Sequence, residues 1–365
     1  MHKRVIIGGG GTGGHIFPAI SIANALRAAD KDIEILFVGA LNKIEMDKVP
    51  EAGYKIIGLP VAGFQRKLSL KNFTFFLKLW QSMRMSKKII NDFKPDVAVG
   101  VGGYASGPIL KAAAQKNIPI VIQEQNSYAG VTNKILARSA SKICVAYDGM
   151  ERFFPAKKII LTGNPVRKDI VTMSASKAPS LLHFGLDPKK QTILILGGSL
   201  GARTINNSII HSLNKIPDSV QVLWQCGKLY YSEMKTKLDE SGKKNIVLKE
   251  FIREMDQAFC AADVIISRAG AGTLSELAIV GKPSILVPSP NVAEDHQTQN
   301  ALSLVNKRAA IMVIDIESKE LLIDKTLSLL NNPKEREKLS GNLKKLAIMD
   351  SAERIAKEIL RLIEK

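Results

Sequence analysis

The sequence predicts two α/β domains, each built on a parallel, doubly wound sheet. Short β-rich runs alternate with helical stretches along the chain, as they do in strand–helix–strand units. A glycine-rich loop between a strand and a helix occurs in each half, at residues 8–14 and 197–202. The length of 365 residues exceeds what a single core usually holds. We therefore expect two domains of ordinary size.

The expected strands fall into two series. The first series comprises residues 5–7, 33–38, 54–59, 96–101, 119–123, 142–146 and 158–161. The second series comprises residues 192–196, 220–224, 246–248, 263–267, 284–287 and 311–314. Between them the pattern pauses in a polar stretch, so the domains are expected at residues 1–165 and 166–350. A last helix, at 351–363, has no strand after it and is expected to pack outside its own sheet.

The first glycine loop predicts a phosphate site. A loop without Cβ atoms leaves its N–H groups uncovered, and the dipole of the following helix adds positive potential. The loop fits GxGxxG twice, but the second strand ends in Val38-Gly39-Ala40, without the acidic residue that holds the ribose of a dinucleotide. Gly14-His15 stands where a P-loop needs lysine and Ser/Thr. Nicotinamide binding is therefore disfavoured, and P-loop phosphoryl transfer is excluded.

Three further segments follow expected strands. Residues 100–108 predict a second anion site, with tight packing as the alternative. Residues 267–276 are again strand, loop and helix, with Glu276 expected in the first helical turn. This carboxylate either stabilises the helix dipole or accepts two hydroxyl groups of a ribose. Residues 293–300 carry uncharged amides that suit the hydroxyl groups of a sugar.

The composition indicates a cytoplasmic protein with an anionic partner. The formal net charge is +18, aromatic residues make up 5% of the chain, and no nucleic-acid-binding signature is present. We therefore expect a phosphorylated substrate or an acidic membrane surface as the partner, and no nucleic acid. No apolar run is long enough to span a bilayer, and the first apolar stretch is too short for a signal peptide. Cys144, Cys226 and Cys260 lack disulfide or zinc-site spacing and are expected to be reduced core residues.

Several of these segments carry motifs in a fixed order: Gly-Gly-Thr-Gly-Gly-His at 10–15, Gly-Gly-Tyr-x-Ser-Gly-Pro at 102–108, Glu-Gln-Asn at 124–126, Gly-Asn-Pro-Val-Arg at 163–167, Gly-Gly-Ser-x-Gly-Ala at 197–202, and the loops of Glu276 and Gln297. Over nearly the whole chain, they closely resemble the MurG family of peptidoglycan N-acetylglucosaminyltransferases. The resemblance implies a GT-B fold, in which two Rossmann-like domains with parallel sheets face a central cleft and the last helix, at 351–365, packs back on the first domain.

The resemblance also implies a reaction. N-acetylglucosamine (GlcNAc) would pass from UDP-GlcNAc to the 4-hydroxyl of the muramoyl sugar of lipid I, which gives lipid II with inversion. The alternatives within the fold are a diacylglycerol glycosyltransferase and a UDP-GlcNAc 2-epimerase. Outside this class, they are a nicotinamide-binding oxidoreductase and a non-catalytic nucleotide-binding protein.

By position, the resemblance assigns the donor contacts to Thr12, Gly13, Gly14, Asn126, Arg167, Ser199, Ile252, Ala271, Gly272, Thr273, Leu274, Ser275, Glu276 and Gln297. Ser199 and the adjoining N–H groups would hold the leaving diphosphate, and Glu276 would hold the ribose. Ile252 would lie against the uracil, while Asn126 and Gln297 would hold the sugar. The acceptor's diphosphate is assigned to Gly102, Gly103, Tyr104, Ser106 and Gly107. One departure is Gly39-Ala40, where the family commonly has a threonine after the glycine, although Glu45 remains nearby.

His15 is the candidate base for the acceptor hydroxyl, because a helix N-terminus disfavours the imidazolium form. The alternative is that His15 caps the loop or contacts a phosphate. No metal and no cofactor are expected. The Asp-x-Asp string Asp30-Lys31-Asp32 precedes the second strand and would lie at the end of the sheet away from the glycine loops. Positive loops and helix N-termini would then replace a metal ion at the diphosphate.

A lipid acceptor implies that the first domain contacts an anionic membrane surface. The candidate residues for this contact are Phe64, Phe73, Phe75 and Phe76, which have basic neighbours. Core packing is the expectation for Leu77, Trp80 and Met83 in the same helix. We therefore expect a peripheral protein on the cytoplasmic side of the cell (inner) membrane. UDP-GlcNAc and lipid I would be its substrates, with cell-wall synthesis proteins among its candidate partners.

Overall fold

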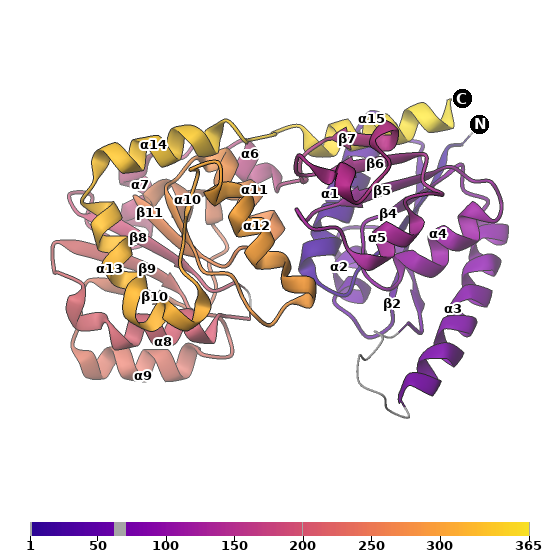
Figure 1. The fold of residues 1–365 in the computed structure, drawn as a ribbon. Coiled ribbons are helices and arrows are strands. Elements are labelled where there is room, and N and C mark those ends of the chain that lie inside the picture. Colours follow the sequence, from indigo (N-terminus) through magenta and orange to yellow (C-terminus); the bar gives the residue numbers. More distant parts are fainter. Residues whose placement is uncertain (1, 62–70, 199, 365) are drawn as a thin grey trace. The chain divides into compact units, whose positions relative to one another are not determined.

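The computed structural model describes residues 2–61, 71–198 and 200–364. Its contacts divide the chain into two compact units, Met1–Val166 together with Met349–Lys365, and Arg167–Ile348 (Figure 1). Phe64 and Ser199 lie outside the described residues, and the side chain of Phe73 is not described either. In the part of the chain that the structure describes, no helix is both long and apolar enough to cross a membrane.

The first unit contains a seven-stranded parallel sheet with the order β3-β2-β1-β4-β5-β6-β7. Its strands are β1 (Arg4–Gly8), β2 (Glu34–Ala40), β3 (Lys55–Leu59), β4 (Val97–Gly100), β5 (Ile120–Glu124), β6 (Lys142–Val145) and β7 (Ile159–Leu161). Its helices are α1 (Gly13–Ala29), α2 (Glu45–Glu51), α3 (Lys71–Phe93), α4 (Ser106–Ala114), α5 (Val131–Leu136) and α15 (Ser351–Ile363). All the strands predicted for the first half of the chain are confirmed.

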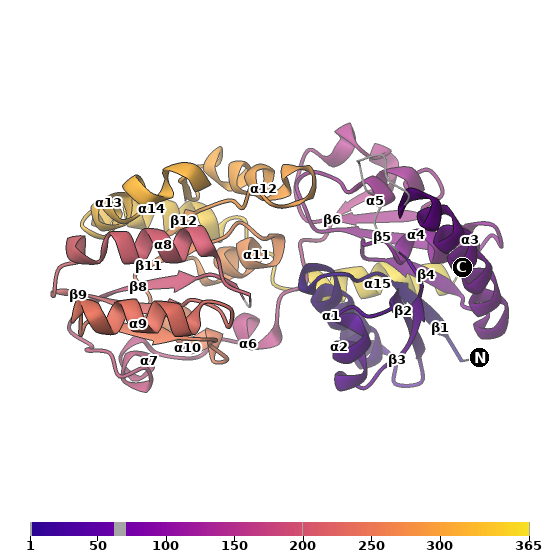
Figure 2. The same cartoon turned by 90° about the horizontal axis from the view of Figure 1, so that it is seen from below.

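Helices cover both faces of this sheet because successive strand side chains point to opposite sides. Val5 and Ile7 pack in the cluster that contains Ile16 of α1 and Ile355 of α15. Ile6, between them, packs in the other cluster, with α3, α4 and α5. Helix α15 lies against α1, although the whole second unit separates the two helices in the sequence (Figures 1 and 2). The apolar stripe of α15 thus completes the core of the first unit.

The second unit contains a six-stranded parallel sheet with the order β10-β9-β8-β11-β12-β13. Its strands are β8 (Gln191–Leu196), β9 (Val220–Gln225), β10 (Ile246–Lys249), β11 (Val264–Ser267), β12 (Ser284–Leu286) and β13 (Ile311–Met312). Its helices are α6 (Lys168–Val171), α7 (Lys177–His183), α8 (Arg203–His211), α9 (Tyr231–Ser241), α10 (Met255–Ala261), α11 (Ala271–Val280), α12 (His296–Val305), α13 (Ser318–Leu330) and α14 (Pro333–Lys344). The strands predicted for the second half are confirmed as well.

The three cysteines are free and buried, as the sequence predicts. Burial raises the pKa of the Cys144 thiol to about 12. Burial likewise raises the pKa of the Cys226 thiol to about 11. Because the thiolate is the reactive form, neither of these two residues is suited to nucleophilic chemistry.

Candidate functional site

The predicted loops lie at the points where the strand order reverses. In the first sheet β1 has β2 on one side and β4 on the other, and in the second sheet β8 lies between β9 and β11. Ligands of open parallel sheets bind outside the carboxyl ends of the strands at such a switch point. Residues 9–12 and 101–105 follow β1 and β4, while residues 197–202 and 268–270 follow β8 and β11. The topology therefore brings these loops together in pairs, one pair in each unit.

The N-termini of the helices that follow these four strands favour the binding of anions. No acidic side chain lies in the first turn of α1, α4, α8 or α11. The first N–H groups of a helix have no partner within the helix, and the dipole makes this end positive. Each of these helix ends is therefore compatible with a phosphate or another anion.

The first glycine loop does not offer the N–H groups that the sequence suggested. The N–H of Gly9 donates to Val38 O at 3.0 Å, and that of Gly10 donates to Gly102 O at 3.3 Å. The N–H of Gly11 donates to both carboxylate oxygens of Glu45 at 2.9 Å. The prediction of a phosphate site made by these loop amides is therefore wrong. Only the following residues, at the start of α1, remain as anion donors in this segment.

The Glu45 carboxylate holds this loop in place through hydrogen bonds. Its side chain is fully buried, and Oε1 also accepts a hydrogen bond from the N–H of Ala40 at 2.9 Å. A Cβ atom on Gly10 would lie 2.2 Å from Glu45 Oε1, and one on Gly103 would lie 2.1 Å from Gly10 O. Glycine is required at both positions because the carboxylate and the two loops are packed directly on one another. The sequence shows an acid near the end of β2 but gives no sign of this role.

His15 lies between the first glycine loop and the loop after β4. Its Nδ1 is 3.1 Å from Thr12 Oγ1. A Cβ atom on Gly102 would lie 2.8 Å from His15 Nε2, so the far edge of the imidazole faces that glycine. If Nδ1–H donates to the Thr12 hydroxyl, Nε2 carries the lone pair toward the 102–107 segment. The structure thus brings the candidate base next to the candidate acceptor loop.

Two members of the candidate acceptor loop have different environments. The hydroxyl of Ser106 donates to Gly103 O at 2.9 Å, and the residue is fully buried. Ser106 therefore shapes the loop through this bond. Tyr104 is 59% exposed and is available to a ligand. Gly102 and Gly103 have φ of 91° and 83°, a conformation that favours glycine.

Glu124 positions Asn126, which is a role that the sequence did not reveal. Glu124 is 2% exposed, and its Oε1 accepts bonds from the backbone N–H and the side-chain Nδ2 of Asn126 at 3.0 and 3.3 Å. Its Oε2 accepts bonds from Gly130 N and Asn133 Nδ2 at 3.0 and 2.8 Å. A buried carboxylate with four donors is held firmly. The Glu-Gln-Asn motif is thus one structural unit, in which the acid orients the amide.

In the second unit, Glu276 is paired with Arg167. Arg167 Nε donates to Glu276 Oε1 at 3.1 Å, and the carboxylate is only 18% exposed. Burial raises the pKa of Glu276 above its ordinary 4.5, although Arg167 acts in the opposite direction. Helix α11 begins at Ala271, so the expectation of Glu276 in its first turn is wrong. A stabilising effect on the helix dipole therefore does not explain this acid.

Gln297 joins two loops through its amide oxygen. Oε1 accepts bonds from the N–H groups of Ala269 at 3.2 Å and Ser289 at 2.9 Å. The NH₂ group then has no partner among the described residues and can donate to a ligand. Glu294 and Asp295, just before α12, have φ of 54° and 52°, which strains a residue other than glycine. Strain of this kind is often found at ligand sites.

Ile252 and Leu274 are buried donor-site candidates. Ile252 is 2% exposed, and its N–H donates to Gln225 Oε1 at 2.8 Å. Gln225 in turn donates from Nε2 to Gly198 O at 3.1 Å and so connects two of the loops. Leu274 is 1% exposed, so its side chain belongs to the core. Gln225 is a further positioning residue that the motifs did not indicate.

Helix α3 exposes large apolar side chains. Phe76, Leu77 and Trp80 are 61%, 56% and 64% exposed. The expectation that Leu77 and Trp80 are core residues is therefore wrong. The reason is that Ile89 and Ile90, in the second half of the helix, make the contact with the core of the sheet.

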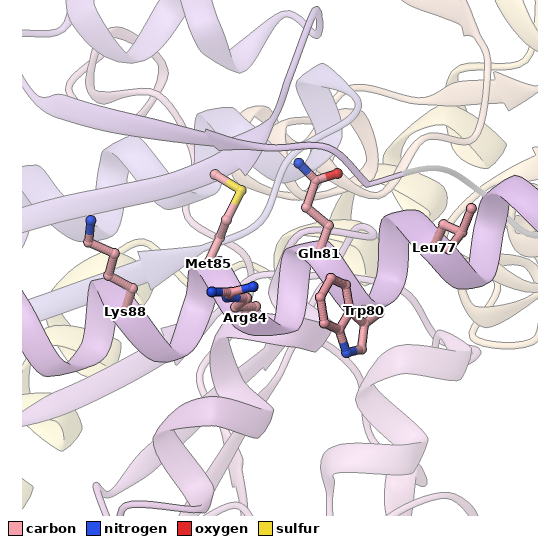
Figure 3. Close-up of a pocket in the computed structure, with 6 residues that line it drawn as sticks. All are labelled: Leu77, Trp80, Gln81, Arg84, Met85 and Lys88. Atoms are coloured by element: carbon pink, nitrogen blue, oxygen red, sulfur yellow. The ribbon is translucent and has the colours of Figure 1, made fainter.

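One side of α3 combines apolar and basic groups. A pocket of about 530 Å³ is lined by Leu77, Trp80, Gln81, Arg84, Met85 and Lys88 (Figure 3). The Arg84 guanidinium lies 5.8 Å from the centre of the Trp80 ring, within range of a cation–π contact.

In the part of the chain that is described, no three His, Cys, Asp or Glu side chains form a group that could hold a metal ion.

Comparisons with known proteins give consistent results. The glycosyltransferase family 28 N-terminal domain matches residues 5–145, and the glycosyltransferase family 28 C-terminal domain matches residues 192–356. A relative from Phocaeicola vulgatus is 57% identical over 99% of this chain and 97% of its own length. One from Parabacteroides distasonis is 55% identical over 99% of both chains. Both are named UDP-N-acetylglucosamine--N-acetylmuramyl-(pentapeptide) pyrophosphoryl-undecaprenol N-acetylglucosamine transferase.

Solved structures share the fold. The crystal structure of Acinetobacter baumannii MurG matches with a TM-score of 0.80 and 27% identity, over 98% of this chain and 99% of that chain. A UDP-GlcNAc 2-epimerase from Neisseria meningitidis, bound to UDP-GlcNAc, matches with a TM-score of 0.69 over 99% of this chain and 100% of that chain. Its identity is only 16%, so that similarity concerns the fold alone.

Proposed function

This chain belongs to glycosyltransferase family 28, and from that premise we propose that it transfers GlcNAc from UDP-GlcNAc to the 4-hydroxyl of the muramoyl sugar of lipid I. The product is lipid II, a precursor of peptidoglycan, and the sugar is inverted at its anomeric carbon. The resemblance to the MurG family and the GT-B fold class are confirmed. The observation that carries the proposal is the 57% identity, over nearly the full length of both chains, to a relative with this activity in its name.

The donor would bind at the switch point of the second unit. The N-terminus of α11, at residues 271–273, supplies N–H groups and a positive dipole for the diphosphate. Ser199 remains a prediction for the same group. Glu276 would exchange or share its bond with Arg167 and accept the two ribose hydroxyls. Ile252 is a buried residue next to this site, and its position against the uracil remains a prediction.

The acceptor would bind at the switch point of the first unit. Its diphosphate would lie at residues 102–107, and its 4-hydroxyl would come within reach of His15 Nε2. His15 would take the proton as the hydroxyl attacks the anomeric carbon from the side opposite the leaving UDP. Thr12, Gly13 and Gly14 at the start of α1 would contact the donor in the same step. Asn126, held by Glu124, would hydrogen-bond to the sugar that is transferred, as would Gln297.

The exposed side of α3 would attach the protein to the cytoplasmic face of the cell membrane. Phe76 and Trp80 offer apolar surface, and Arg84 and Lys88 lie close to them on the helix. Apolar groups flanked by basic ones suit insertion at an anionic interface. The net charge of +18 acts in the same direction. Proteins of cell-wall synthesis remain candidate partners.

Three rival functions differ from this proposal in the residues or the substrates that they need. A nicotinamide cofactor needs an acid at the end of β2 that is available to the ribose, and Glu45 is instead fully buried beneath the loop. A 2-epimerase would act on UDP-GlcNAc without an acceptor. A diacylglycerol glycosyltransferase would differ only in the acceptor.

The proposed function is tested by transfer of radiolabelled GlcNAc from UDP-GlcNAc to a lipid I analogue. We expect a labelled disaccharide lipid that forms only when both substrates are present. Diacylglycerol replaces the acceptor in one control, and UDP-GlcNAc is incubated alone in another. Labelled glycolipid from diacylglycerol, or epimerised UDP-GlcNAc without an acceptor, would contradict the proposal. Titration with UDP, UDP-GlcNAc and NADH separates the nucleotide classes, and binding of NADH alone would support the oxidoreductase.

A further inference from the structure

A second depression lies in the first unit, between α3, α4 and α5. It has a volume of about 540 Å³, which is within the range of small-molecule sites. Its apolar lining comes from all three helices and includes Phe75, Leu79, Met83, Pro108, Ile135 and Leu136. Among the described residues that line it, none is acidic. We call it the α3–α5 groove.

Apolar side chains in this groove remain in contact with water. Ile135 on α5 is 72% exposed, and Leu79 on α3 is 38% exposed. Large apolar side chains exposed from two separate helices toward one groove are typical of a ligand site. Phe75, Leu79 and Met83 are spaced four residues apart, so they form one row along α3. Phe76 and Trp80 belong to the neighbouring row, outside the groove.

One end of the groove suits a phosphate. Tyr104 and Gly107 belong to the candidate acceptor loop, and both line the groove. Lys111 lines it too, one turn after Gly107 and on the same face of α4. The α3–α5 groove thus continues from an anion-binding end into an apolar body. A lipid diphosphate has the same sequence of a charged head followed by a hydrocarbon chain.

We infer that the α3–α5 groove holds the first isoprene units of the acceptor's polyprenyl chain, next to the diphosphate at residues 102–107. This inference rests on the proposed function, because that function supplies the lipid diphosphate. As the occupant of the groove, the polyprenyl chain of the acceptor is favoured over a membrane phospholipid, because the groove begins at the candidate acceptor loop itself. The two rows of apolar side chains on α3 then contact different partners. The row of Phe76 and Trp80 contacts the membrane, and the row of Phe75, Leu79 and Met83 contacts the bound lipid.

The test compares two acceptors with the same diphosphate-muramoyl head. One carries a polyprenyl chain and the other a short, water-soluble alkyl chain, and both are assayed with the full chain at one fixed detergent concentration. The measured quantity is the ratio of kcat/KM for the long acceptor to kcat/KM for the short one. Partitioning into detergent affects every variant equally and cancels when ratios are compared. Thermal unfolding of each variant verifies that it is folded.

Ile135→Ser should lower this ratio about fivefold, the scale set by the loss of one branched side chain that the bound lipid would partly cover. Ser139→Trp, at an exposed lining position, should lower it as well by filling the groove. Val131→Ser is the matched control, since Val131 is 53% exposed on the same helix but does not line the groove. It should keep the ratio of the parent.

An unchanged ratio in both groove variants, or an equal fall in Val131→Ser, would overturn the inference. Short-chain phosphatidylglycerol, added in an amount equal to the acceptor, should leave the parent's ratio unchanged. If the added phospholipid lowered the ratio of the parent, the groove would be assigned to membrane phospholipid, and the inference would be contradicted. If the parent transfers GlcNAc to neither acceptor, the proposed function fails and the inference fails with it. Transfer to both acceptors without groove dependence removes the inference alone.

Discussion

At the scale of single residues, three carboxylates have comparable roles, two of them buried and the third, Glu276, partly buried. Glu45 holds the first glycine loop, Glu124 holds Asn126, and Glu276 pairs with Arg167. Burial of an acid is unfavourable unless donors compensate it, and each of these has at least one N–H donor or a cation. The acids therefore fix loops and side chains of the candidate site before any ligand arrives.

Glu276→Gln should weaken UDP-GlcNAc binding about tenfold, the scale of losing charge-assisted hydrogen bonds to a carboxylate. The fold should persist because the Arg167 side chain is 40% exposed and can be solvated by water. Isothermal titration gives the affinity, and thermal unfolding gives the stability. Parental affinity in a folded variant would show that Glu276 does not hold the ribose.

The affinity for UDP-GlcNAc should also fall as the pH is lowered from 7 toward 5. Burial raises the pKa of Glu276, so its protonated fraction grows in this direction. A protonated carboxyl group accepts fewer hydroxyl bonds than a carboxylate. UDP-GlcNAc is the suitable probe, since UDP has a terminal phosphate that titrates nearby. Glu276→Gln should lose this part of the pH dependence, and an identical profile in parent and variant would exclude Glu276 as its source.

His15→Ala should reduce kcat by about a hundredfold or more, the usual scale for a general base, with little change in donor affinity. Thr12 provides a second test, because the base needs Nδ1–H directed at its hydroxyl. Thr12→Val should lower kcat and alter its pH profile, while Thr12→Ser should keep both. Single-turnover kinetics separate the chemical step from binding. A loss confined to donor affinity would leave His15 only as a phosphate contact or a cap.

At the scale of helices and strands, the sequence predicts the sheets well and the packing of α3 poorly. Continuous β-rich runs such as residues 193–196 are typical of parallel strands buried on both faces, and all the predicted strands are present. The apolar side chains of α3 form more than one row along the helix, and the sequence pattern does not indicate which of these rows covers the sheet. Ile89 and Ile90 make the contact with the core, and Trp80 is left exposed.

The same limit applies to the candidate site. Motif spacing places Glu276 and Gln297 in the segments that follow strands β11 and β12, because strand order and the position of these segments follow from local pattern. The hydrogen bonds of Gly11 with Glu45, and of Gln225 with Ile252, join residues far apart in the sequence. Each depends on the register of neighbouring elements, which is set by tertiary packing. For this reason the sequence alone predicts phosphate binding by the amides of the glycine loop, although these amides are already bonded within the protein.

Phe76→Ser combined with Trp80→Ser should weaken binding to anionic vesicles without lowering the thermal stability. Both side chains are more than half exposed, so little core packing is lost. Co-sedimentation with phosphatidylglycerol vesicles is the measurement, and binding of the parent should weaken with salt. Leu182→Ser is the control, at a position 64% exposed in the second unit. Unchanged vesicle binding in the double variant would locate the membrane contact elsewhere.

At the scale of the whole molecule, activity should survive an excess of EDTA. The proposed donor site uses helix N-termini such as that of α11 to stabilise the charge of the diphosphate. Radiolabelled transfer is measured before and after chelation. Complete loss of transfer that Mg²⁺ or Mn²⁺ restores would contradict this prediction.

The return of α15 to the first unit predicts a large effect of its buried side chains on stability. Ile359→Ala should cost about 2–5 kcal/mol of unfolding free energy, since Ile359 is fully buried against the first sheet. Lys357→Ala, at an exposed position two residues earlier, should change it by less than about 0.5 kcal/mol. Denaturant unfolding of both variants gives the comparison. Equal stability of the two would mean that α15 contributes little to this core.

This arrangement also constrains the order in which the protein can be completed during synthesis. Helix α15 leaves the ribosome only after all of Arg167–Ile348 has been made. At about 5–20 residues per second, that interval lasts roughly 10 to 40 s. Throughout it, the face of α1 that α15 will cover has no protein partner from its own chain. A nascent chain interrupted late in the second unit would therefore carry an unfinished first unit, and chaperones that shield apolar surface would be needed earliest at the part of the protein that was made first.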